Sequence, residues 1–296
     1  MIKETSTFKK VNLFIIGVNK SGTSWLYHIL KQHPQVCMSD IKELYYFGRV
    51  YPEKMDEYHS HFRFDHDYQY NGEATPTYYR NAGTAVQIKE YNPEARLLVI
   101  VRDPIKRFLS HFYYHKQLGI VAEDTNIQQF LAGDTGFLLS DSHYEHSLPS
   151  FWHIFGEEQL LIVSLEQAKT DPEAVWQKIT EFLKVNPVPL PLPRDRSENP
   201  TGSKWFRSIY RATIQPVKRR NYGLYETMLK NRALRWTKLL LLKLTGLAKK
   251  DELSPKIMSR LVEEFDPTYK YLKSLDILDI TAPNINMQSG NKEKGL

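Results

Sequence analysis

The feature that most constrains this chain of 296 residues is an apolar run that leads directly into a loop of glycine, lysine and hydroxyl residues. Residues 11–16 read Val-Asn-Leu-Phe-Ile-Ile, which is typical of a strand buried on both faces of a sheet. Residues 17–22 read Gly-Val-Asn-Lys-Ser-Gly, and a helix is expected from Thr23 to about Gln32. A tight loop before a helix brings backbone N–H groups and the positive end of the helix to one point. The segment therefore predicts an anion-binding pocket.

The loop departs from the common nucleotide-binding P-loop, G-x-x-x-x-G-K-[ST], in which the lysine directly follows the second glycine. Here Thr23 follows Gly22, and Lys20 lies inside the loop. The phosphate-binding lysine and the magnesium-binding hydroxyl are thus not at their usual positions, which weighs against a kinase or an ATPase. A plain turn between a strand and a helix is the alternative for this segment alone.

A second apolar run, residues 95–101, ends in Arg102. Asp103 can cap the helix that follows, and Pro104 suits its first turn. Arg102 would stand at the carboxyl end of a parallel strand, where open α/β sheets bind their ligands, and Ser110 about two turns into the helix. A guanidinium and a hydroxyl that converge suit a phosphate group. An ion pair with a nearby carboxylate is the alternative for Arg102 alone.

Together the two segments resemble the sulfotransferases that use 3′-phosphoadenosine 5′-phosphosulfate (PAPS). In that family the first loop holds the 5′-phosphosulfate, and an R-D-P-x-x-R-x-x-S segment holds the 3′-phosphate. The resemblance covers residues 14–25 and 97–110. It implies that Arg102 and Ser110 bind the 3′-phosphate, that Lys20 also acts in catalysis, and that Arg107 serves mainly a structural ion pair. The residues assigned to the phosphosulfate end are Lys20, Ser21, Gly22, Thr23, Ser24 and Trp25.

A weaker resemblance concerns the base that must take a proton from the acceptor. His33-Pro34 followed by residues 42–47, Lys-Glu-Leu-Tyr-Tyr-Phe, is similar to the stretch that carries a catalytic glutamate in the heparan-sulfate type of sulfotransferase. The resemblance implies that Glu43 is the base. A solvated lysine–glutamate pair at a turn is one alternative, and a histidine base, as in other sulfotransferases, is another.

Two further stretches match the family less fully. Residues 72–79, Gly-Glu-Ala-Thr-Pro-Thr-Tyr-Tyr, look like the next landmark of the heparan-sulfate enzymes, which have a lysine where this chain has Ala74. Glu73 is therefore expected to lack that partner. Around residues 199–204 the family tends to have a basic cofactor loop, which implies a contact from Lys204.

Strands that alternate with helical stretches predict one α/β domain with a central parallel sheet flanked by helices, P-loop-like, and the resemblance implies the sulfotransferase fold. We expect this domain to occupy residues 1–280, and residues 281–296 to form a disordered tail. Strands are expected near residues 11–17, 97–101 and 160–165, and helices near 23–33, 81–92, 104–118, 172–184 and 254–275.

Positive charge is concentrated in residues 204–250, which contain thirteen Lys or Arg and only Glu226 as an acidic residue. This basic helical stretch could be a lid for an anionic ligand, a peripheral membrane contact, a nucleic-acid contact or a solvated excursion. Nucleic acid is not expected as a partner, because no nucleic-acid fold signature accompanies the stretch.

The remaining features narrow the class of protein. The single cysteine, Cys37, excludes an internal disulfide. His111 and His115 are four residues apart but lack the carboxylate of a zinc-binding motif, so no metal is expected. The first ten residues contain no apolar signal region, and we expect a cytoplasmic protein.

These observations predict a sulfotransferase that moves a sulfuryl group from PAPS to a hydroxyl or amine of a small-molecule or glycan acceptor. The other product would be 3′-phosphoadenosine 5′-phosphate (PAP), and no metal would be required. Two alternatives stay open. A P-loop kinase for a small molecule would need magnesium and a γ-phosphate. A non-catalytic protein could instead bind a membrane or an anionic polymer through residues 204–250.

Overall fold

The computed structural model describes residues 10–133, 135–191 and 253–283. These residues fall into two compact units. The described parts of the first unit are residues 10–107, 140–191 and 264–283, and those of the second are residues 108–133, 135–139 and 253–263. The strands of the described residues all belong to the first unit.

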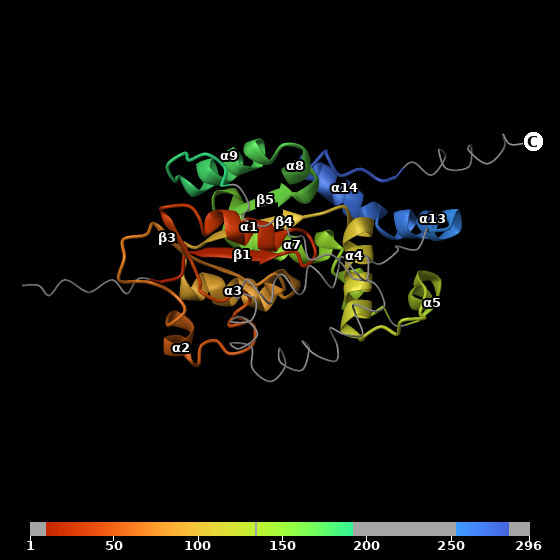
Figure 1. The fold of residues 1–296 in the computed structure, drawn as a ribbon, viewed down its shortest axis with the longest axis horizontal. Helices are drawn as coiled ribbons and strands as arrows, with labels where there is room; N and C mark the ends of the chain where they lie inside the picture. The colour runs from red at the N-terminus through yellow and green to blue at the C-terminus, as the bar shows by residue number, and fades with distance from the viewer. Residues whose placement is uncertain (1–9, 134, 192–252, 284–296) are drawn as a thin grey trace, which may run out of the picture. The chain divides into compact units, whose positions relative to one another are not determined.

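The first unit is built on a five-stranded, fully parallel sheet with the strand order β2-β3-β1-β4-β5 (Figure 1). The strands are β1 (Leu13–Gly17), β2 (Val36–Met38), β3 (Tyr70–Ala74), β4 (Arg96–Val101) and β5 (Leu160–Ser164). From the central strand β1 the chain first builds β2 and β3 on one side, and then β4 and β5 on the other. The carboxyl ends of β1 and β4 therefore flank the switch point at which open α/β sheets bind ligands.

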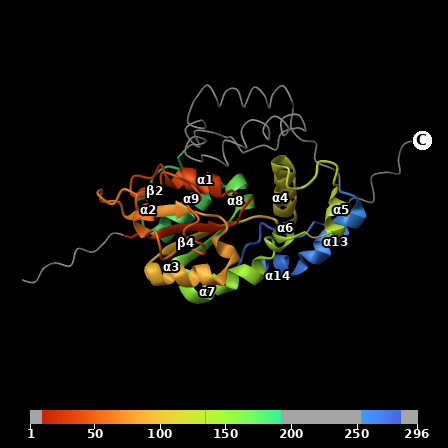
Figure 2. The same ribbon diagram turned by 90° about the horizontal axis from the view of Figure 1, so that it is seen from below.

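Helices of the first unit cover both faces of this sheet (Figure 2). One face is covered by α1 (Thr23–Leu30), α8 (Leu165–Thr170) and α9 (Pro172–Leu183). On the other face lie α3 (Ala82–Tyr91) and α7 (Tyr144–Gln159), which contact each other. Burial on both faces explains why β1 and β4 are nearly continuous apolar runs.

The other described helices lie outside these two layers or connect the strands. They are α2 (Met55–His59), the 3₁₀ turn Tyr78–Arg80, α4 (Pro104–Leu118), α5 (Ile127–Ala132), α6 (Phe137–Ser140), α13 (Pro255–Glu264) and α14 (Asp266–Ser274). In the described ranges no helix has both the length and the apolar character needed to cross a membrane.

The predicted fold class is confirmed, and the predicted strands and helices up to residue 184 are found within a few residues of their expected ends. The single helix predicted for residues 254–275 is wrong, because the chain forms α13 and α14 with a break at Phe265. Pro267 lies in the first turn of α14, where its missing N–H is tolerated, whereas it cannot continue a preceding helix. The single domain over residues 1–280 stays a prediction, and the basic stretch 204–250 lies outside the described residues.

Leu98 tests the central position of β4. It is fully buried in the core shared with α1 and α9, so Leu98→Ala should lower the free energy of unfolding by about 2–5 kcal/mol through lost contacts and a residual cavity. The control Leu278→Ala removes a side chain that is 59% exposed and should change it by less than about 0.5 kcal/mol. Urea unfolding of the two variants measures both values, and equal losses would contradict this packing.

Candidate functional site

The loop after β1 folds back on the end of the neighbouring strand β4. The Val18 N–H donates to the Ile100 carbonyl at 2.9 Å, and the Ser21 N–H donates to the Val18 carbonyl at 3.1 Å. Gly22 has a left-handed backbone (φ 103°), and a Cβ there would lie 2.8 Å from the Leu165 Cδ1 atom. The left-handed conformation is the reason that glycine is required at this position.

Helix α1 begins at this glycine without a compensating side chain. Gly22 provides no side-chain cap, and the first turn of α1 contains no acidic residue. The predicted residues Thr23, Ser24 and Trp25 form this turn; Thr23 is buried, Ser24 exposed and Trp25 partly buried. The positive end of the helix thus faces the loop without a carboxylate from its own first turn, which is a suitable arrangement for binding an anion.

Arg102, which follows β4, joins the two strand ends. Its Nη1 atom donates to the Lys20 carbonyl at 3.1 Å, and its own carbonyl accepts from the Tyr144 hydroxyl at 2.8 Å. Lys20 has a left-handed backbone (φ 71°), which is uncommon for a residue with a long side chain. The structure therefore brings together Lys20 and Arg102, two residues that lie 82 positions apart in the sequence.

The two cations affect each other electrostatically. Burial lowers the pKa of Lys20 from its usual 10.5 to about 8, and the charge of Arg102 acts in the same direction. The Glu43 carboxylate opposes this shift, whereas the positive charges of Arg107 and Lys42 add to it. Positive charge is therefore in excess around Lys20, and a bound anion would relieve it.

Unpaired polar atoms provide a test of whether an anionic co-substrate fits this place. Among the described residues, three buried side-chain polar atoms have no hydrogen-bond partner, and two of them are Ser21 Oγ and Arg102 Nε. Buried donors without partners are costly. Both belong to residues predicted to bind the phosphate groups of PAPS, so the residues present fit a ligand rich in anionic oxygens.

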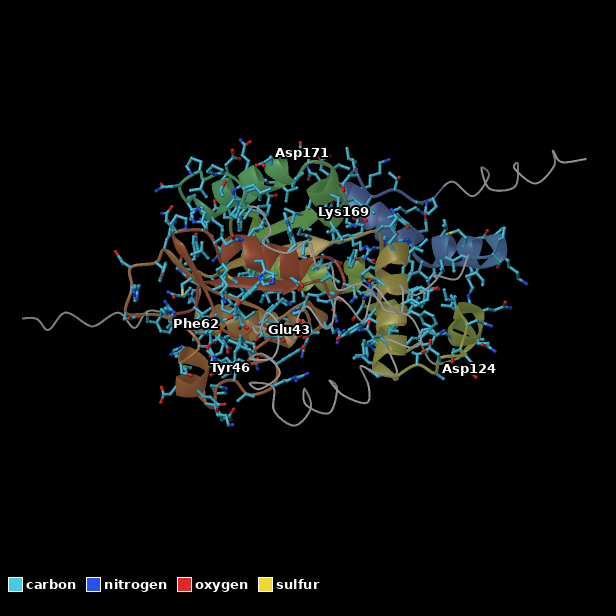
Figure 3. The ribbon with its side chains drawn as sticks, viewed as in Figure 1. Glu43, Tyr46, Phe62, Asp124, Lys169 and Asp171 are labelled. Carbon is cyan, nitrogen blue, oxygen red and sulfur yellow. The ribbon has the colours of Figure 1, made fainter. Side chains whose placement is uncertain are left out.

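Glu43 lies in the segment between β2 and α2, as does Tyr46 (Figure 3). Its carboxylate accepts from the Lys42 ammonium at 2.9 Å and from the Tyr45 hydroxyl, and its N–H donates to the Ala74 carbonyl at 3.0 Å. The Glu43 side chain is 35% exposed, so it remains accessible to a second substrate. The lysine–glutamate pair, which was the alternative interpretation of this residue, is present, and the role of Glu43 as the base stays a prediction. The Glu43 carboxylate also lies close enough to act on Lys20.

Glu73 is fully buried in β3 and bonded by hydroxyls. Tyr58 and Tyr78 donate to its Oε1 atom at 2.8 and 3.1 Å, and Thr75 donates to Oε2 at 3.0 Å. Burial raises its pKa to about 7, and the three hydroxyl donors oppose the rise. Glu73 lacks a lysine at position 74, as expected, but these three hydroxyls supply its hydrogen bonds.

Arg107 has the predicted structural role. Its fully buried side chain pairs with Asp141 at 3.6 Å and bonds the Ser142 hydroxyl. Asp141 also accepts from the Arg80 Nε atom at 2.7 Å. This cluster ties the start of α4 and the 3₁₀ turn after β3 to the segment before α7. The prediction of an ion pair for Arg107 is confirmed.

The remaining predicted residues are placed only in part. Asp103 caps α4, since its Oδ1 atom accepts from the Lys106 N–H at 2.7 Å, as predicted. Ser110 lies in α4 but in the second unit, so its role beside Arg102 stays a prediction. Lys204 lies outside the described residues.

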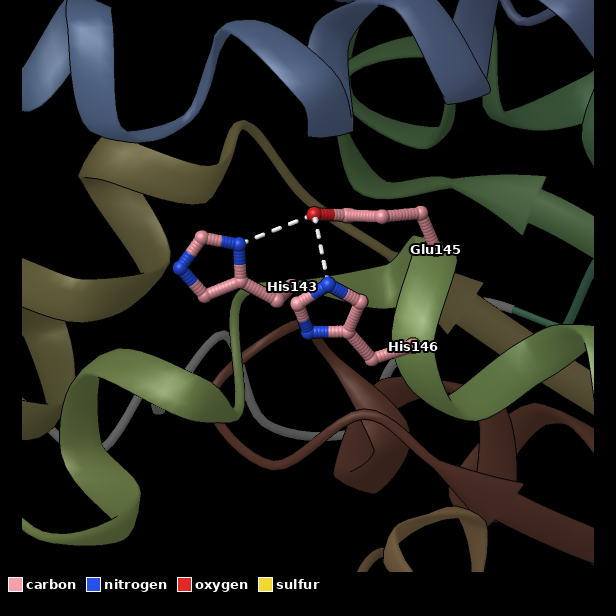
Figure 4. Close-up of side chains that lie close together, drawn as sticks. All are labelled: His143, Glu145 and His146. Atoms are coloured by element: carbon pink, nitrogen blue, oxygen red, sulfur yellow. Dashed lines mark hydrogen bonds and ion pairs between the residues drawn. The ribbon is translucent and has the colours of Figure 1, made fainter.

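Among the described residues, one group of possible metal ligands lies at the start of α7, away from His111 and His115. Atoms of His143, Glu145 and His146 lie within 4.8 Å of one another (Figure 4). His143 Nδ1 and Glu145 Oε1 are 2.9 Å apart, and the other oxygen of Glu145 accepts from Thr268 at 2.7 Å. Hydrogen bonds to Glu145 and Glu264 raise the pKa of His143, which favours an ion pair between α7 and the segment around α14.

Two hollows in the first unit lie away from these residues. Their volumes are about 310 and 460 Å³, and they are lined at the amino ends of the strands by residues such as Asn12, Asn71 and Arg96. Neither is lined by a predicted site residue. The candidate site is therefore defined by converging donors at the carboxyl ends of β1 and β4.

Sequence reasoning missed the tyrosines that support the site. Tyr144, Tyr58 and Tyr78 are buried, and their hydroxyls bond Arg102 or Glu73. Buried tyrosine hydroxyls need partners, but which partner each one finds depends on tertiary contacts between distant segments. A tyrosine-rich sequence alone contains no signal for these pairs.

Comparisons with known proteins show the family to which this chain belongs. A family model described as "Sulfotransferase domain" matches residues 10–266. Over 114 residues the chain is 35% identical to membrane-associated sulfotransferase kil1 of Dictyostelium discoideum, covering 36% of this chain and 23% of the relative. Over 175 residues it is 29% identical to human heparan sulfate glucosamine 3-O-sulfotransferase 3B1, covering 57% of this chain and 45% of the relative. The chain thus matches less than half the length of either relative.

A solved structure has the same fold over most of its length. The crystal structure of a sulfotransferase from Alicyclobacillus acidocaldarius superposes with a TM-score of 0.62 at 20% sequence identity, covering 90% of this chain and 96% of that chain. At this identity the similarity concerns the fold.

The lowered pKa of Lys20 predicts a pH-dependent effect on stability. Lys20→Met should stabilise the ligand-free protein at pH 7, because a pKa drop from 10.5 to about 8 corresponds to about 3 kcal/mol, which solvent screening reduces to about 1–2 kcal/mol. From about pH 8 to 10.5 the folded protein has released this proton while the unfolded chain still holds it, so wild-type stability rises and the difference shrinks. Urea unfolding at pH 7 and 9.5 measures the difference in free energy of unfolding between variant and wild type. If the exposed control Lys169→Met gave an equal gain in stability at pH 7, burial would not be the cause.

Proposed function

This chain belongs to the sulfotransferase domain family, and on that premise we propose that it transfers a sulfuryl group from PAPS to a hydroxyl or amine of a small-molecule or glycan acceptor. The observation that carries the proposal is the meeting of Lys20, Ser21 and Arg102 at the carboxyl ends of β1 and β4, where two buried polar atoms lack partners. The family membership and the fold of the solved relative support the same conclusion.

We assign the phosphosulfate end of PAPS to the loop after β1, with Lys20, Ser21, Gly22, Thr23, Ser24 and Trp25 as contacts. Arg102 and Ser110 would hold the 3′-phosphate, with Lys204 as a further contact. A 3′-phosphate is absent from ATP, so a charged group for it discriminates between the two nucleotides. The anionic ligand also supplies partners for the donors that the protein leaves unpaired.

The chemistry needs one base and a concentrated positive charge. PAPS supplies an activated sulfuryl group when bound. Glu43 takes the proton from the acceptor as the new sulfur–oxygen or sulfur–nitrogen bond forms. Lys20 and the N–H groups at the start of α1 stabilise the negative charge on the transferring group and on the departing phosphate. The products are the sulfated acceptor and PAP, and the proton stays on Glu43 until solvent removes it.

A glycan acceptor is supported by the surroundings of Glu43. Lys42 bonds Glu43, and the exposed Arg49 lies 4.4 Å from the centre of the Tyr45 ring. Two cations beside the proposed base, one of them over an aromatic ring, suit a sugar that carries carboxylate or sulfate groups. The human relative is named a heparan sulfate glucosamine 3-O-sulfotransferase, which supports a glycan hydroxyl. The cytoplasmic location stays a proposal, and the Dictyostelium relative is named membrane-associated.

Nucleotide binding tests the assignment of Arg102. PAP should bind the wild type at least about 10-fold more tightly than ATP, and Arg102→Met should weaken PAP binding by about 10- to 100-fold, because a hydrogen bond to a charged group contributes about 1.5–3 kcal/mol. The control Arg96→Met lies at the opposite end of the same strand and should leave PAP affinity unchanged. Calorimetry measures each dissociation constant. Equal affinity for ATP and PAP would overturn the proposal and favour a kinase.

Replacement of the proposed base tests the catalytic step. Glu43→Gln keeps the shape of the side chain but cannot take a proton, so turnover should fall by about 10²–10⁴-fold. The affinity for PAP should stay within about 2-fold of the wild-type value, because Glu43 is assigned to the acceptor and not to the nucleotide. Transfer of sulfur-35 from labelled PAPS to an acceptor found in a glycan and metabolite screen measures turnover. Glu57→Gln, at an exposed position in α2, is the control. Unaltered turnover of Glu43→Gln would assign the base to another residue.

A further inference from the structure

The buried Glu73 carboxylate is linked through side-chain hydroxyls to residues 45–47, which follow Glu43 in the chain. The Tyr78 hydroxyl, which donates to Glu73 Oε1 at 3.1 Å, accepts from the Tyr46 and Phe47 N–H groups at 2.9 and 3.2 Å. The Tyr78 hydroxyl thus donates its proton to the carboxylate and accepts, through its lone pairs, from the backbone of residues 46–47. Residues 43–47, which include Glu43, are called the catalytic segment below.

A second hydroxyl repeats this pattern at the other carboxylate oxygen. Thr75 Oγ1 donates to Glu73 Oε2 at 3.0 Å and accepts from the Tyr45 N–H at 3.4 Å. An ionised carboxylate only accepts hydrogen bonds, so it fixes the direction of both hydroxyls and leaves their lone pairs turned toward backbone N–H groups. The network therefore has one polarity as long as Glu73 accepts.

The segment held in this way needs external support. Glu43 and Tyr45 both have left-handed backbones, with φ values of 70° and 53°. Such conformations are unfavourable for residues other than glycine by about 1–2 kcal/mol each and persist only when surrounding contacts hold them. Three backbone hydrogen bonds hold this segment to β3 and the turn after it. The Tyr46 N–H donates to the Tyr78 hydroxyl, the Tyr45 N–H donates to Thr75 Oγ1, and the Glu43 N–H donates to the Ala74 carbonyl.

We propose that Glu73 is a positioning residue: through the Tyr78 and Thr75 hydroxyls it holds the backbone of residues 45–47 and thereby keeps the Glu43 carboxylate in place for proton abstraction. The inference rests on the proposed function for its kinetic consequence and on the hydrogen-bond network for its structural one. No charged side chain among the described residues pairs with Glu73, so the hydroxyls are its route of action.

Two tyrosines offer a matched pair of variants. Tyr58 and Tyr78 are each 3% exposed, and each donates one hydrogen bond to Glu73 Oε1. Only Tyr78 also accepts from the backbone of the catalytic segment. Tyr78→Phe and Tyr58→Phe therefore remove the same bond to the same oxygen but differ in the connection to residues 45–47.

The expected result is a split between the two variants in kcat. Tyr78→Phe should lower kcat about 10- to 100-fold, the effect expected of a slightly misplaced catalytic group, with KM for PAPS and PAP affinity within about 2-fold. Tyr58→Phe should keep kcat within about 3-fold while melting at a similarly reduced temperature. Equal losses of kcat in the two variants would overturn the proposal, since they would show a general effect of a lost buried hydrogen bond.

Hydrogen exchange gives a readout that requires no acceptor. In Tyr78→Phe the amides of Tyr46 and Phe47 should exchange at least about 10-fold faster than in the wild type, because each loses its acceptor. In Tyr58→Phe they should exchange at the wild-type rate. If Tyr78→Phe does not fold, Thr75→Val removes the bond to Tyr45 in a side chain of the same shape, and the Tyr45 amide should then exchange faster. Unchanged exchange in the folded variant would overturn the proposal.

A double-mutant cycle tests whether Glu73 acts through Tyr78. Glu73→Gln should lower kcat, as Tyr78→Phe does. The kcat of the double variant should lie within about 3-fold of the lower of the two single-variant values, because the effects of two substitutions in one network do not add. Multiplicative losses would show independent roles and contradict the inference. A wild-type protein that transfers no label from PAPS would refute the proposed function, whereas the exchange contrast would still decide the network.

Discussion

The site depends on one electrostatic constraint: two cations meet where neighbouring parallel strands end. Arg102 holds the loop after β1 by a hydrogen bond to the Lys20 carbonyl. Burial lowers the pKa of the Lys20 ammonium, and the charge of Arg102 lowers it further. In the ligand-free protein this arrangement costs stability, since like charges and unpaired buried donors oppose folding. The cost is compatible with the proposed function, in which an anion is the missing partner and its binding stabilises the folded state by mass action.

The proposed base, Glu43, is supported by a different kind of interaction from that of the loop after β1. The loop is shaped by backbone bonds, by Gly22 and by the start of α1, whereas the segment around Glu43 is held by side-chain hydroxyls of Tyr78 and Thr75. Stacked and edge-on rings fill the space behind it, including Tyr46 against Tyr58 with ring centres 4.1 Å apart. Rigid aromatic packing of this kind limits the freedom of a segment that has no regular secondary structure.

The parts of the fold that follow from local patterns were predictable. Buried parallel strands are continuous apolar runs, so β1, β4 and β5 could be recognised from the sequence. Asp103 indicated where α4 begins, because aspartate is a favourable N-cap residue. Strand β3, Tyr-Asn-Gly-Glu-Ala, could not be recognised from its pattern because a polar carboxylate stands where an apolar residue is expected. The break between α13 and α14 follows from Pro267, whose effect competes with a continuous amphipathic pattern on both sides.

In the site itself, only the residues that belong to short motifs with a characteristic spacing could be predicted. The loop at Lys20 and the Arg102 segment could be located because backbone geometry imposes their glycines and strand ends, and the parallel sheet then brings the two strand ends together. The partners of Glu73 could not be found in this way. Tyr58 and Tyr78 come from separate segments and reach one oxygen only after the chain has folded, and burial of the carboxylate, which no local pattern encodes, is what makes their hydrogen bonds necessary. The burial of the Glu73 carboxyl group without a cationic partner therefore depends on the tertiary structure and not on a local sequence pattern. Its hydroxyl partners connect the core of the sheet to the base on its edge.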